Sequence, residues 1–139
     1  MIREARLCDA REIFEILEKT DDPWTMGVIE SEITSSNSFF YVYEEASEVL
    51  AFADIKILFD EADLMHIAVR EDKRNMGLAK KLLEHIINIA DEKKLPIALE
   101  VRAKNYKAIN LYKNFDFKKE GIRKNYYHGE DAVLMWRRK

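Results

Sequence analysis

The spacing of apolar residues predicts one long helix, over residues 77–93. Apolar side chains recur there every three or four positions, at Leu78, Leu82, Leu83, Ile86, Ile87, Ile89 and Ala90. Positions spaced in this way fall on one side of an α-helix. The stripe is wide enough to cover part of a sheet, so we expect the helix to pack on one.

Three shorter helices are expected from capping residues. Asp9, with Glu12 three residues later, forms a capping-box pattern, which predicts a helix that begins at this point. A weaker helix follows Thr25, and another runs from its cap Asn105 to about Asn114.

Runs rich in β-branched and aromatic residues predict the strands. They cover residues 2–6, 39–43, 49–59, 62–69, 97–102, 117–127 and 132–136. The predicted order is therefore β-α-α-β-β-β-α-β-α-β-β, within a single domain of residues 1–139. Short connections make the three consecutive strands an antiparallel meander, whereas the strand–helix–strand crossover implies one parallel pair. The fold class is α/β (α+β), with a mixed, mostly antiparallel central sheet.

Composition narrows the class of function. Of the 139 residues, 47% are hydrophobic, and 23 basic against 26 acidic residues give a net charge of −3. This weak acidity argues against direct nucleic-acid binding and is compatible with a basic peptide or an amine as substrate. No apolar run is long enough to span a membrane, the N-terminus lacks a secretory signal, and the single cysteine cannot form a disulfide within the chain. We therefore expect a cytoplasmic protein with no membrane partner.

The loop before the long helix has the composition of an anion site. Strand residues 65–69 lead through a polar linker to residues 74–79, which open the helix. The first amides of a helix lack internal partners and carry partial positive charge, and Gly77 with the small Ala79 would let a phosphate approach them. An ordinary loop-to-helix junction would look the same. There is no Walker or dinucleotide-binding glycine motif and no cluster with metal-ligand spacing, so no metal is expected.

Three side chains are candidates for catalysis. Glu100 lies on a predicted strand between Leu99 and Val101, which face the opposite way. Burial of an unpaired carboxylate is costly, so Glu100 is exposed, paired with a nearby Arg or Lys, or functional. Tyr112 could equally be a core residue with a hydrogen-bonded hydroxyl. His66 is either an assisting base or a histidine satisfied by packing and one hydrogen bond.

Two motifs together resemble the GNAT superfamily of N-acetyltransferases. Arg74-x-x-Gly77-x-Ala79 fits its Q/R-x-x-G-x-G/A acetyl-CoA motif, and Asn105-x-x-Ala108-x-x-Leu111-Tyr112 fits the motif that follows. The order of elements agrees over nearly the whole chain. The resemblance implies the GNAT fold, with helices on both faces of the sheet, and acetyl-CoA as cosubstrate. It also implies the cofactor-binding residues, which are Ile67, Ala68, Val69, Arg74, Asn75, Met76, Gly77, Leu78, Ala79, Lys80 and Asn105.

Further segments are similar to one branch of that superfamily, the ribosomal-protein-alanine N-acetyltransferases (RimI type). These segments are Pro23-Trp24-Thr25, Glu61-Ala62-x-Leu64, Leu99-Glu100-Val101-Arg102-Ala103-x-Asn105 and Arg123-Lys124-Asn125-Tyr126-Tyr127. The resemblance implies direct transfer of acetyl to a protein N-terminus, the N-terminal alanine of a small-subunit ribosomal protein. The chain departs from the branch at Asp116 and Ala79, where glycine is usual; the first is expected to alter a turn, and the motif allows the second.

The resemblance also implies the catalytic roles. Glu100 resembles the proton acceptor for the incoming amine, and Tyr112 resembles the proton donor for the departing thiolate. Backbone amides of a bulged strand would stabilise the oxyanion. Trp24, Tyr126 and Tyr127 are expected to line the acceptor groove, although Trp24 could instead anchor a loop and the two tyrosines could lie at the edge of the core.

Two other functions are compatible with the same scaffold. One is acetylation of a free amine, such as a polyamine, an amino acid or an aminoglycoside. The other is a non-catalytic acyl-CoA-binding module, which the presence of both Glu100 and Tyr112 disfavours. A monomer or a weak dimer is expected, because an edge strand near the C-terminus could pair with a second copy.

Overall fold

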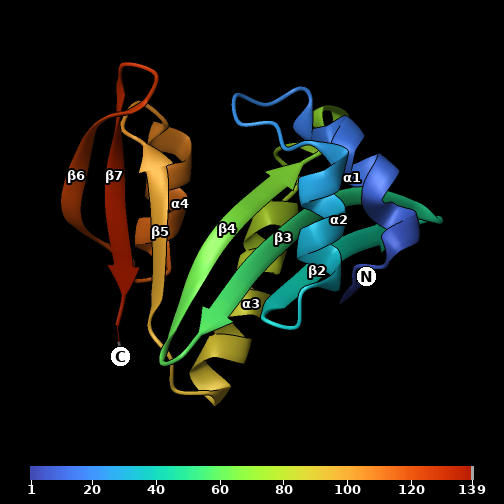
Figure 1. Cartoon of the computed structure of the whole chain (residues 1–139), viewed down its shortest axis with the longest axis horizontal. Coiled ribbons are helices and arrows are strands. Elements are labelled where there is room, and N and C mark those ends of the chain that lie inside the picture. Colours follow the sequence, from blue (N-terminus) through green and yellow to red (C-terminus); the bar gives the residue numbers. More distant parts are fainter. Residues whose placement is uncertain (139) are drawn as a thin grey trace.

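The computed structural model describes residues 1–138 and contains one seven-stranded sheet, in the order β1-β2-β3-β4-β5-β7-β6 (Figure 1). The elements are β1 (Ile2–Glu4), α1 (Ala10–Leu17), α2 (Met26–Thr34), β2 (Ser38–Glu45), β3 (Glu48–Leu58), β4 (Glu61–Val69), α3 (Leu78–Glu92), β5 (Ile97–Arg102), α4 (Tyr106–Asn114), β6 (Lys118–Tyr127) and β7 (Glu130–Arg137). The predicted element order is confirmed. Two short 3-10 turns, Leu7–Asp9 and Glu71–Lys73, are additions that periodicity did not reveal.

Every neighbouring pair of strands is antiparallel except β4 and β5, so the prediction of a single parallel pair is correct. This parallel ladder is very short, with Ala62 opposite Ile97 and Asp63 opposite Ala98 and no further pairs. Beyond these residues the two strands diverge, as Figure 1 shows. A bulge at Met65 bends β4 where the separation begins, since the register with β3 passes from Ile55–Leu64 to Asp54–His66.

Helices cover both faces of the sheet and bury separate apolar clusters. On one face α3 buries Leu82, Leu83 and Ile86 completely against the strands. On the other face, Ile13 of α1 and Ile29 of α2 are fully buried in a second cluster. Each fully buried side chain of this size contributes about 1.5–3 kcal/mol, so both layers stabilise the sheet. No helix among residues 1–138 is long and apolar enough to cross a lipid bilayer.

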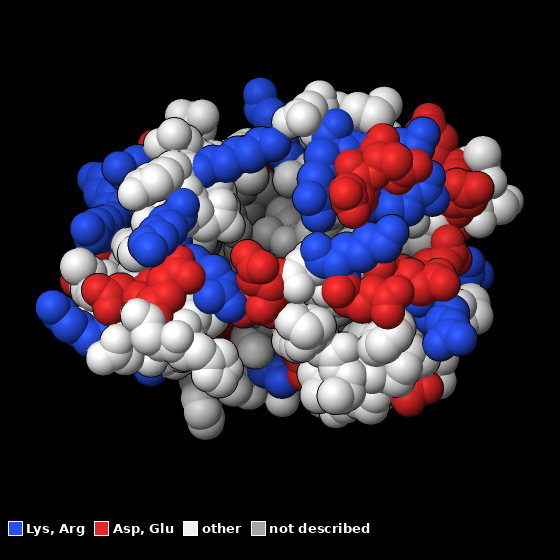
Figure 2. All heavy atoms as spheres, turned by 90° about the horizontal axis from the view of Figure 1, so that it is seen from above, with Lys and Arg blue, Asp and Glu red and all other residues white. Residues whose placement is uncertain are grey.

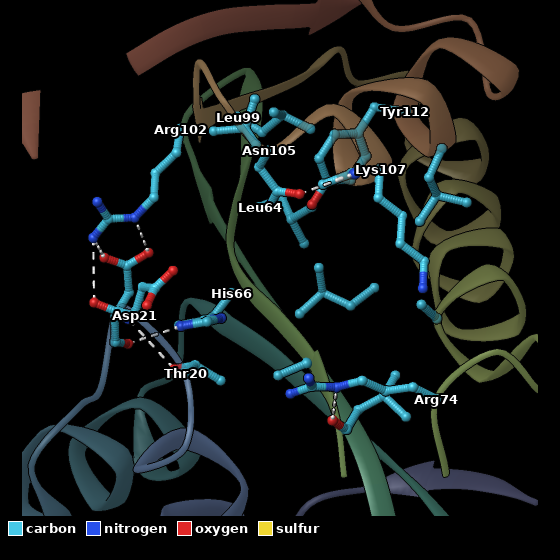
Figure 3. Close-up of a pocket in the computed structure, with 18 of the residues that line it drawn as sticks. Thr20, Asp21, Leu64, His66, Arg74, Leu99, Arg102, Asn105, Lys107 and Tyr112 are labelled. Atoms are coloured by element: carbon cyan, nitrogen blue, oxygen red, sulfur yellow. Dashed lines mark hydrogen bonds and ion pairs between the residues drawn. The ribbon is translucent and has the colours of Figure 1, made fainter. Parts of the chain in front are cut away.

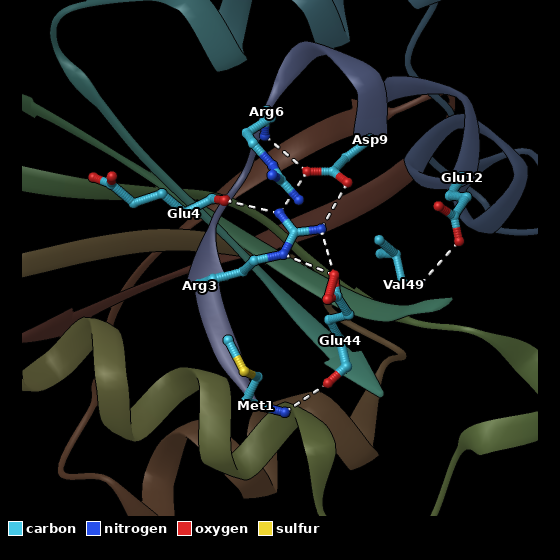
Figure 4. A network of polar contacts seen from close by, with 8 residues as sticks. All are labelled: Met1, Arg3, Glu4, Arg6, Asp9, Glu12, Glu44 and Val49. Atoms are coloured by element: carbon cyan, nitrogen blue, oxygen red, sulfur yellow. Dashed lines mark hydrogen bonds and ion pairs between the residues drawn. The ribbon is translucent and has the colours of Figure 1, made fainter. Parts of the chain in front are cut away.

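The predicted capping box at Asp9 and Glu12 is wrong. The Asp9 carboxylate does not cap α1; it accepts hydrogen bonds from the Arg6 amide (2.7 Å) and from both terminal nitrogens of Arg3 (2.8 and 2.9 Å). Glu12 instead accepts a hydrogen bond from the Val49 amide, at 2.9 Å. Figure 4 shows how Arg3 gathers Asp9 and Glu44 around its guanidinium group. A charge-assisted, forked ion pair is stronger than a helix cap, so the Asp9 carboxylate pairs with Arg3 instead of capping α1.

Asp54 is a carboxylic acid in the core. It is completely buried on β3, and neither carboxylate oxygen has a hydrogen-bond partner among the described residues. Burial, together with the neighbouring Glu32 carboxylate, raises the pKa of Asp54 to about 9. Glu32 itself is paired with Lys56, with 2.8 Å between Oε2 and Nζ. Asp54 is therefore protonated at neutral pH in the folded protein.

Asp54→Asn should stabilise the fold, and the gain should grow as the pH rises from about 4 to about 9. In this window the folded state holds a proton that an ordinary aspartate in the unfolded chain, with a pKa of 3.8, has lost, so stability falls as pH rises. Asparagine does not ionise and removes this loss, which we expect to be worth about 1–3 kcal/mol near pH 8. Urea unfolding near pH 5 and near pH 8 measures the effect. Asp60→Asn, on the exposed β3–β4 turn, is the control; a smaller gain at the higher pH would contradict the assignment.

Candidate active site

A cavity of about 990 Å³ lies where β4 and β5 separate. Leu64 and Leu99 in its wall belong to the apolar cluster under α3 and α4, whereas His66 and Glu100 face the side that carries α1 and α2. The lining therefore comes from both faces, and the cavity passes through the gap in the sheet. Figure 2 shows the hollow in the middle of this surface, with Lys and Arg side chains along one rim and acidic side chains at the opposite one.

The N-terminus of α3 opens into the cavity without a side-chain cap. Its N-cap residue is Gly77, at φ 78°, and no side chain accepts a hydrogen bond from the first turn. Asn75 also has a positive φ, of 66°. A Cβ atom on Gly77 would meet no other atom within 4 Å, so the space beside the loop is open. Unpaired amides, a positive dipole end and a close backbone approach are the features of a phosphate site.

Four basic residues line this mouth of the cavity: Lys73, Arg74, Lys80 and Lys107. Arg74 Nε donates to the backbone oxygen of Val69 at 3.3 Å, and Lys107 Nζ donates to Asn75 Oδ1 at 2.6 Å. These partners are neutral, so the positive charges of both side chains are uncompensated there. Figure 3 shows Arg74 and Lys107 reaching toward the cavity from the loop and from α4. The mouth suits a diphosphate.

The edge of β4 supplies backbone groups to the same space. Ile67, Ala68 and Val69 line the cavity and lie beyond the last residue of β4 that pairs with β5. Their peptide groups on the side away from β3 thus have no strand partner. An extended ligand can hydrogen-bond to such an edge as an added strand would.

Glu100 lies in the gap with an incompletely satisfied carboxylate. Its Oε2 atom is buried and receives no hydrogen bond from the described residues, although Arg123 Nε stands 3.4 Å away as an ion-pair partner. Asp63 lies on the neighbouring strand, β4. Burial raises the pKa of Asp63 above its usual value, and the negative charge of Glu100 raises it further. The sequence left open whether Glu100 is paired with a nearby Arg or Lys, and the structure shows such a pair with Arg123. With Oε2 held only by this long ion pair, the carboxylate keeps unused hydrogen-bond capacity at the wall of the cavity.

Tyr112 approaches the gap from α4. Its ring packs on Phe117, with 5.7 Å between centroids, and the side chain lines the cavity near Leu64 and Leu99 (Figure 3). Burial, and next the nearby Tyr127, raise the pKa of the Tyr112 phenol far above its usual value of 10. The hydroxyl therefore keeps its proton at neutral pH and is available as a hydrogen-bond donor.

The second mouth of the cavity is lined by aromatic side chains. Trp24, Tyr126 and Tyr127 lie there, and the ring of Trp24 meets His66 edge-on at 5.3 Å between centroids. His66 Nε2 lies 3.0 Å from the backbone oxygen of Asp22, so this histidine is held by packing and one hydrogen bond. Burial, followed by the carboxylates of Asp22 and Glu100, raises the pKa of Tyr127 to about 12.

The sequence model of the Acetyltransferase (GNAT) family matches residues 3–117, which is most of the chain. The chain belongs to the GNAT family of acetyltransferases.

Relatives within the GNAT family are similar over most of the chain. A Bacillus subtilis protein provisionally named a ribosomal protein bS18-alanine N-acetyltransferase is 34% identical over 97% of this chain and 93% of its own. The Escherichia coli enzyme of that name is 41% identical over 93 residues, 63% of each chain. The crystal structure of the Escherichia coli ribosomal-protein-S18-alanine N-acetyltransferase superposes with a TM-score of 0.91 at 32% identity, over 98% of this chain and 91% of that one.

Membership in the GNAT family makes this chain an N-acetyltransferase with acetyl-CoA as cosubstrate, and the geometry fits that molecule. The uncapped α3 N-terminus and the basic rim suit its diphosphate, and the free edge of β4 suits its extended pantetheine arm. Within residues 1–138 no three His, Cys, Asp or Glu side chains come together as metal ligands.

Nearly all of the predicted GNAT cofactor residues line the cavity; Met76 does not, since its side chain is 58% exposed on the outside of the loop. Asn105 lines the cavity while its Oδ1 caps α4, accepting from the Ala108 amide at 3.2 Å. Asp116 has a φ of 70°, a region that favours glycine, so the departure from the family does fall on a turn that glycine would form with less strain.

Sequence reasoning missed four residues that line the cavity or adjoin it: Asp22, Asp63, Arg102 and Lys107. Arg102 belongs to one of the segments similar to the RimI branch, but its partners Glu130 and Asp22 are 28 and 80 residues away, so the sequence did not indicate these contacts. Alternation on the strands could have placed Asp63 beside Glu100, had the register of the parallel pair been known.

Gly77→Ala should weaken binding of coenzyme A about tenfold or more. The added methyl group would stand in the open space of the phosphate loop, and alanine disfavours a φ of 78°. Loss of one charge-assisted hydrogen bond to a phosphate is sufficient for this change. Isothermal titration calorimetry gives the dissociation constant. Gly129→Ala is the matched control, because Gly129 has a φ of 93° and equally open surroundings in the β6–β7 turn; equal affinities in the two variants would argue against a phosphate at Gly77.

Proposed function

We propose that this enzyme acetylates the α-amine of a protein that begins with alanine, and that its acceptor in the cytoplasm is ribosomal protein bS18. The names of relatives that are 34% and 41% identical support the choice of acceptor. The cavity supports a protein terminus, because its second mouth is open to solvent and is lined by two tyrosines and a tryptophan.

One observation carries the chemistry: Glu100 lines the gap between β4 and β5, and its Oε2 atom forms only a long ion pair with Arg123, at 3.4 Å, and no hydrogen bond with the described residues. An amine that enters from the second mouth would meet the Glu100 carboxylate before it reaches the cofactor half of the cavity. An α-amino group has a pKa of about 7.7–8.0, so a carboxylate acting directly or through one water suffices to accept its proton.

The other residues of the cavity bind acetyl-CoA and stabilise the charges that develop during acetyl transfer. Acetyl-CoA supplies an acetyl group activated as a thioester. The amides of α3 and the edge of β4 hold that molecule, and amides next to the Met65 bulge stabilise the oxyanion. Tyr112 donates a hydrogen bond to the departing sulfur. Because its pKa is raised far above the value of about 8.5 typical of a thiol, complete proton transfer from Tyr112 is uphill, and stabilisation of the thiolate by the hydrogen bond is the favoured role.

Glu100→Gln should lower kcat about 10²–10⁴-fold and move the pH–rate profile toward alkaline pH. Without the carboxylate, turnover depends on the amine that has already lost its proton, and that fraction rises through about pH 8. Tyr112→Phe is the comparison variant, because it removes one hydroxyl of the same cavity; it should lower kcat about 10²-fold with no alkaline displacement. Steady-state rates from about pH 6 to about pH 9 separate the two. An unchanged profile in Glu100→Gln would assign the base to another group.

A panel of acceptors tests the proposed function. We expect a peptide that begins with alanine to be acetylated with the highest kcat/KM, and the same peptide with a blocked N-terminus to be inert, because the α-amine is the nucleophile. Free lysine, spermidine and an aminoglycoside should react at least tenfold more slowly, since they cannot fill the aromatic mouth. Release of the coenzyme A thiol gives the rates. Faster reaction of a free amine would indicate a small-molecule acetyltransferase, and binding of coenzyme A without any thiol release would indicate a non-catalytic module.

A further inference from the structure

Arg102, the last residue of β5, contacts the loop between α1 and α2 and the ends of β6 and β7 through its guanidinium group. Nη2 and Nε contact the two carboxylate oxygens of Asp22 at 2.6 and 3.3 Å, and Nη1 contacts Glu130 Oε2 at 3.1 Å. Nη2 also donates to the backbone oxygen of Asp21, at 3.2 Å. The planar group stacks over Tyr127, with 4.3 Å between Cζ and the ring centroid. The side chain of Arg102 is partly buried, with 18% of it exposed, and it joins these elements.

The same loop is held from the other side of the gap. His66 on β4 contacts the backbone oxygen of Asp22 at 3.0 Å, while Arg102 on β5 holds its carboxylate. Asp22 thus connects the two strands where they have already separated, and Figure 3 shows the loop lying between Arg102 and His66. We call this crossing, residues Asp21 and Asp22, the strap.

The strap depends on these polar contacts for its position. It lies between α1 and α2 without helical or strand hydrogen bonds of its own, and the side chain of Asp22 is 42% exposed. An exposed ion pair is usually worth little, but a forked guanidinium–carboxylate pair that shares a largely buried arginine fixes direction as well as distance. Arg102 also stacks on Tyr127, so one side chain fixes two walls of the second mouth, which we call the acceptor mouth because the acceptor is proposed to enter there.

We infer that Arg102 is a positioning residue that sets the width of the acceptor mouth and thereby restricts the enzyme to acceptors with a small first residue. The inference rests on the proposed function, since it specifies the N-terminal residue that the same site accepts. A first side chain has to fit between the strap and Tyr127. Both are held by one guanidinium group, so neither moves aside without breaking its contacts.

The test compares Arg102→Met with wild type on peptides that begin with alanine, leucine or phenylalanine. Methionine keeps an apolar stem and loses every donor. We expect KM for the alanine peptide to rise about tenfold and the preference for alanine over leucine to fall about tenfold, while KM for acetyl-CoA changes less than twofold. Arg102→Lys, which keeps the charge but not the fork, should recover part of the preference.

Two further variants control for damage to the fold. Asp22→Ala breaks the same pair from the exposed loop and should reproduce the change in preference. Arg138→Met is the matched control: Arg138 also forms a forked pair, with Glu120 at 3.0 and 3.2 Å, and stacks on Trp136 at 4.1 Å, but it does not line the cavity. It should leave both KM values and the preference unchanged.

The outcomes separate this inference from the proposed function. If wild type acetylates the alanine peptide and both Arg102→Met and Asp22→Ala keep its KM and its preference, the strap does not set the mouth. Equal rises in KM for peptide and acetyl-CoA would also overturn the inference, because they indicate general disruption. If wild type acetylates none of the peptides but does acetylate a free amine, the proposed function fails, and the inference fails with it.

Discussion

Between β4 and β5 only two residue pairs face each other, and the separation of these strands beyond Asp63 and Ala98 produces the whole site. Each side of the gap is stabilised by its own helices, with α3 packed on β2, β3 and β4 and α4 grouped with β5–β7. One apolar cluster nevertheless continues beneath the gap, from Leu64 of β4 to Leu99 of β5. The gap exposes backbone groups at the edge of β4 and lets a cavity connect the two faces of the sheet. An ordinary long ladder at this place would close both mouths.

Charge is divided between the two mouths. Basic side chains surround the phosphate loop, whereas the carboxylates of the cavity, those of Asp21, Asp22 and Glu100, belong to its other half. The net charge of −3 conceals this division, because the two groups largely cancel in the sum. Charges act on one another over about 8–10 Å at physiological salt, so the field at each mouth is set by its own side chains and not by the net charge. One polar bridge crosses the gap at each mouth, from Lys107 to Asn75 and from Arg102 to Asp22.

The sequence predicted the elements well because apolar spacing and capping are local properties. Thr25 and Asn105 cap α2 and α4 as expected, through the amides of Val28 and Ala108. The prediction failed at Asp9, whose carboxylate pairs with Arg3 of β1 instead of capping α1. Glu12, the other half of the predicted box, accepts from Val49, 37 residues away, and no local pattern contains that contact.

In the site, too, features encoded by neighbouring residues could be predicted, and features that depend on distant residues could not. The phosphate loop could be found from residues near one another in sequence, whereas the roles of Glu100 and Tyr112 came from resemblance to a family. The strap could not be found, because 80 residues separate Arg102 from Asp22 and nothing in either segment specifies the other. Asp54 did give a signal, as a carboxylate within an apolar run, and the structure shows it buried in the middle of the sheet.

Tyr127 connects the strap to the proposed base. The carboxylates of Asp22 and Glu100 both raise its pKa after burial has done so, and the guanidinium of Arg102 opposes them. With a pKa of about 12 the hydroxyl keeps its proton and can donate a hydrogen bond to an acceptor. Loss of the strap would thus change the charge felt by Tyr127 and, through it, the surroundings of Glu100. Because residues that share one network do not contribute additively, the proposal that Arg102 sets the mouth and the proposal that Glu100 accepts the proton of the amine are not independent.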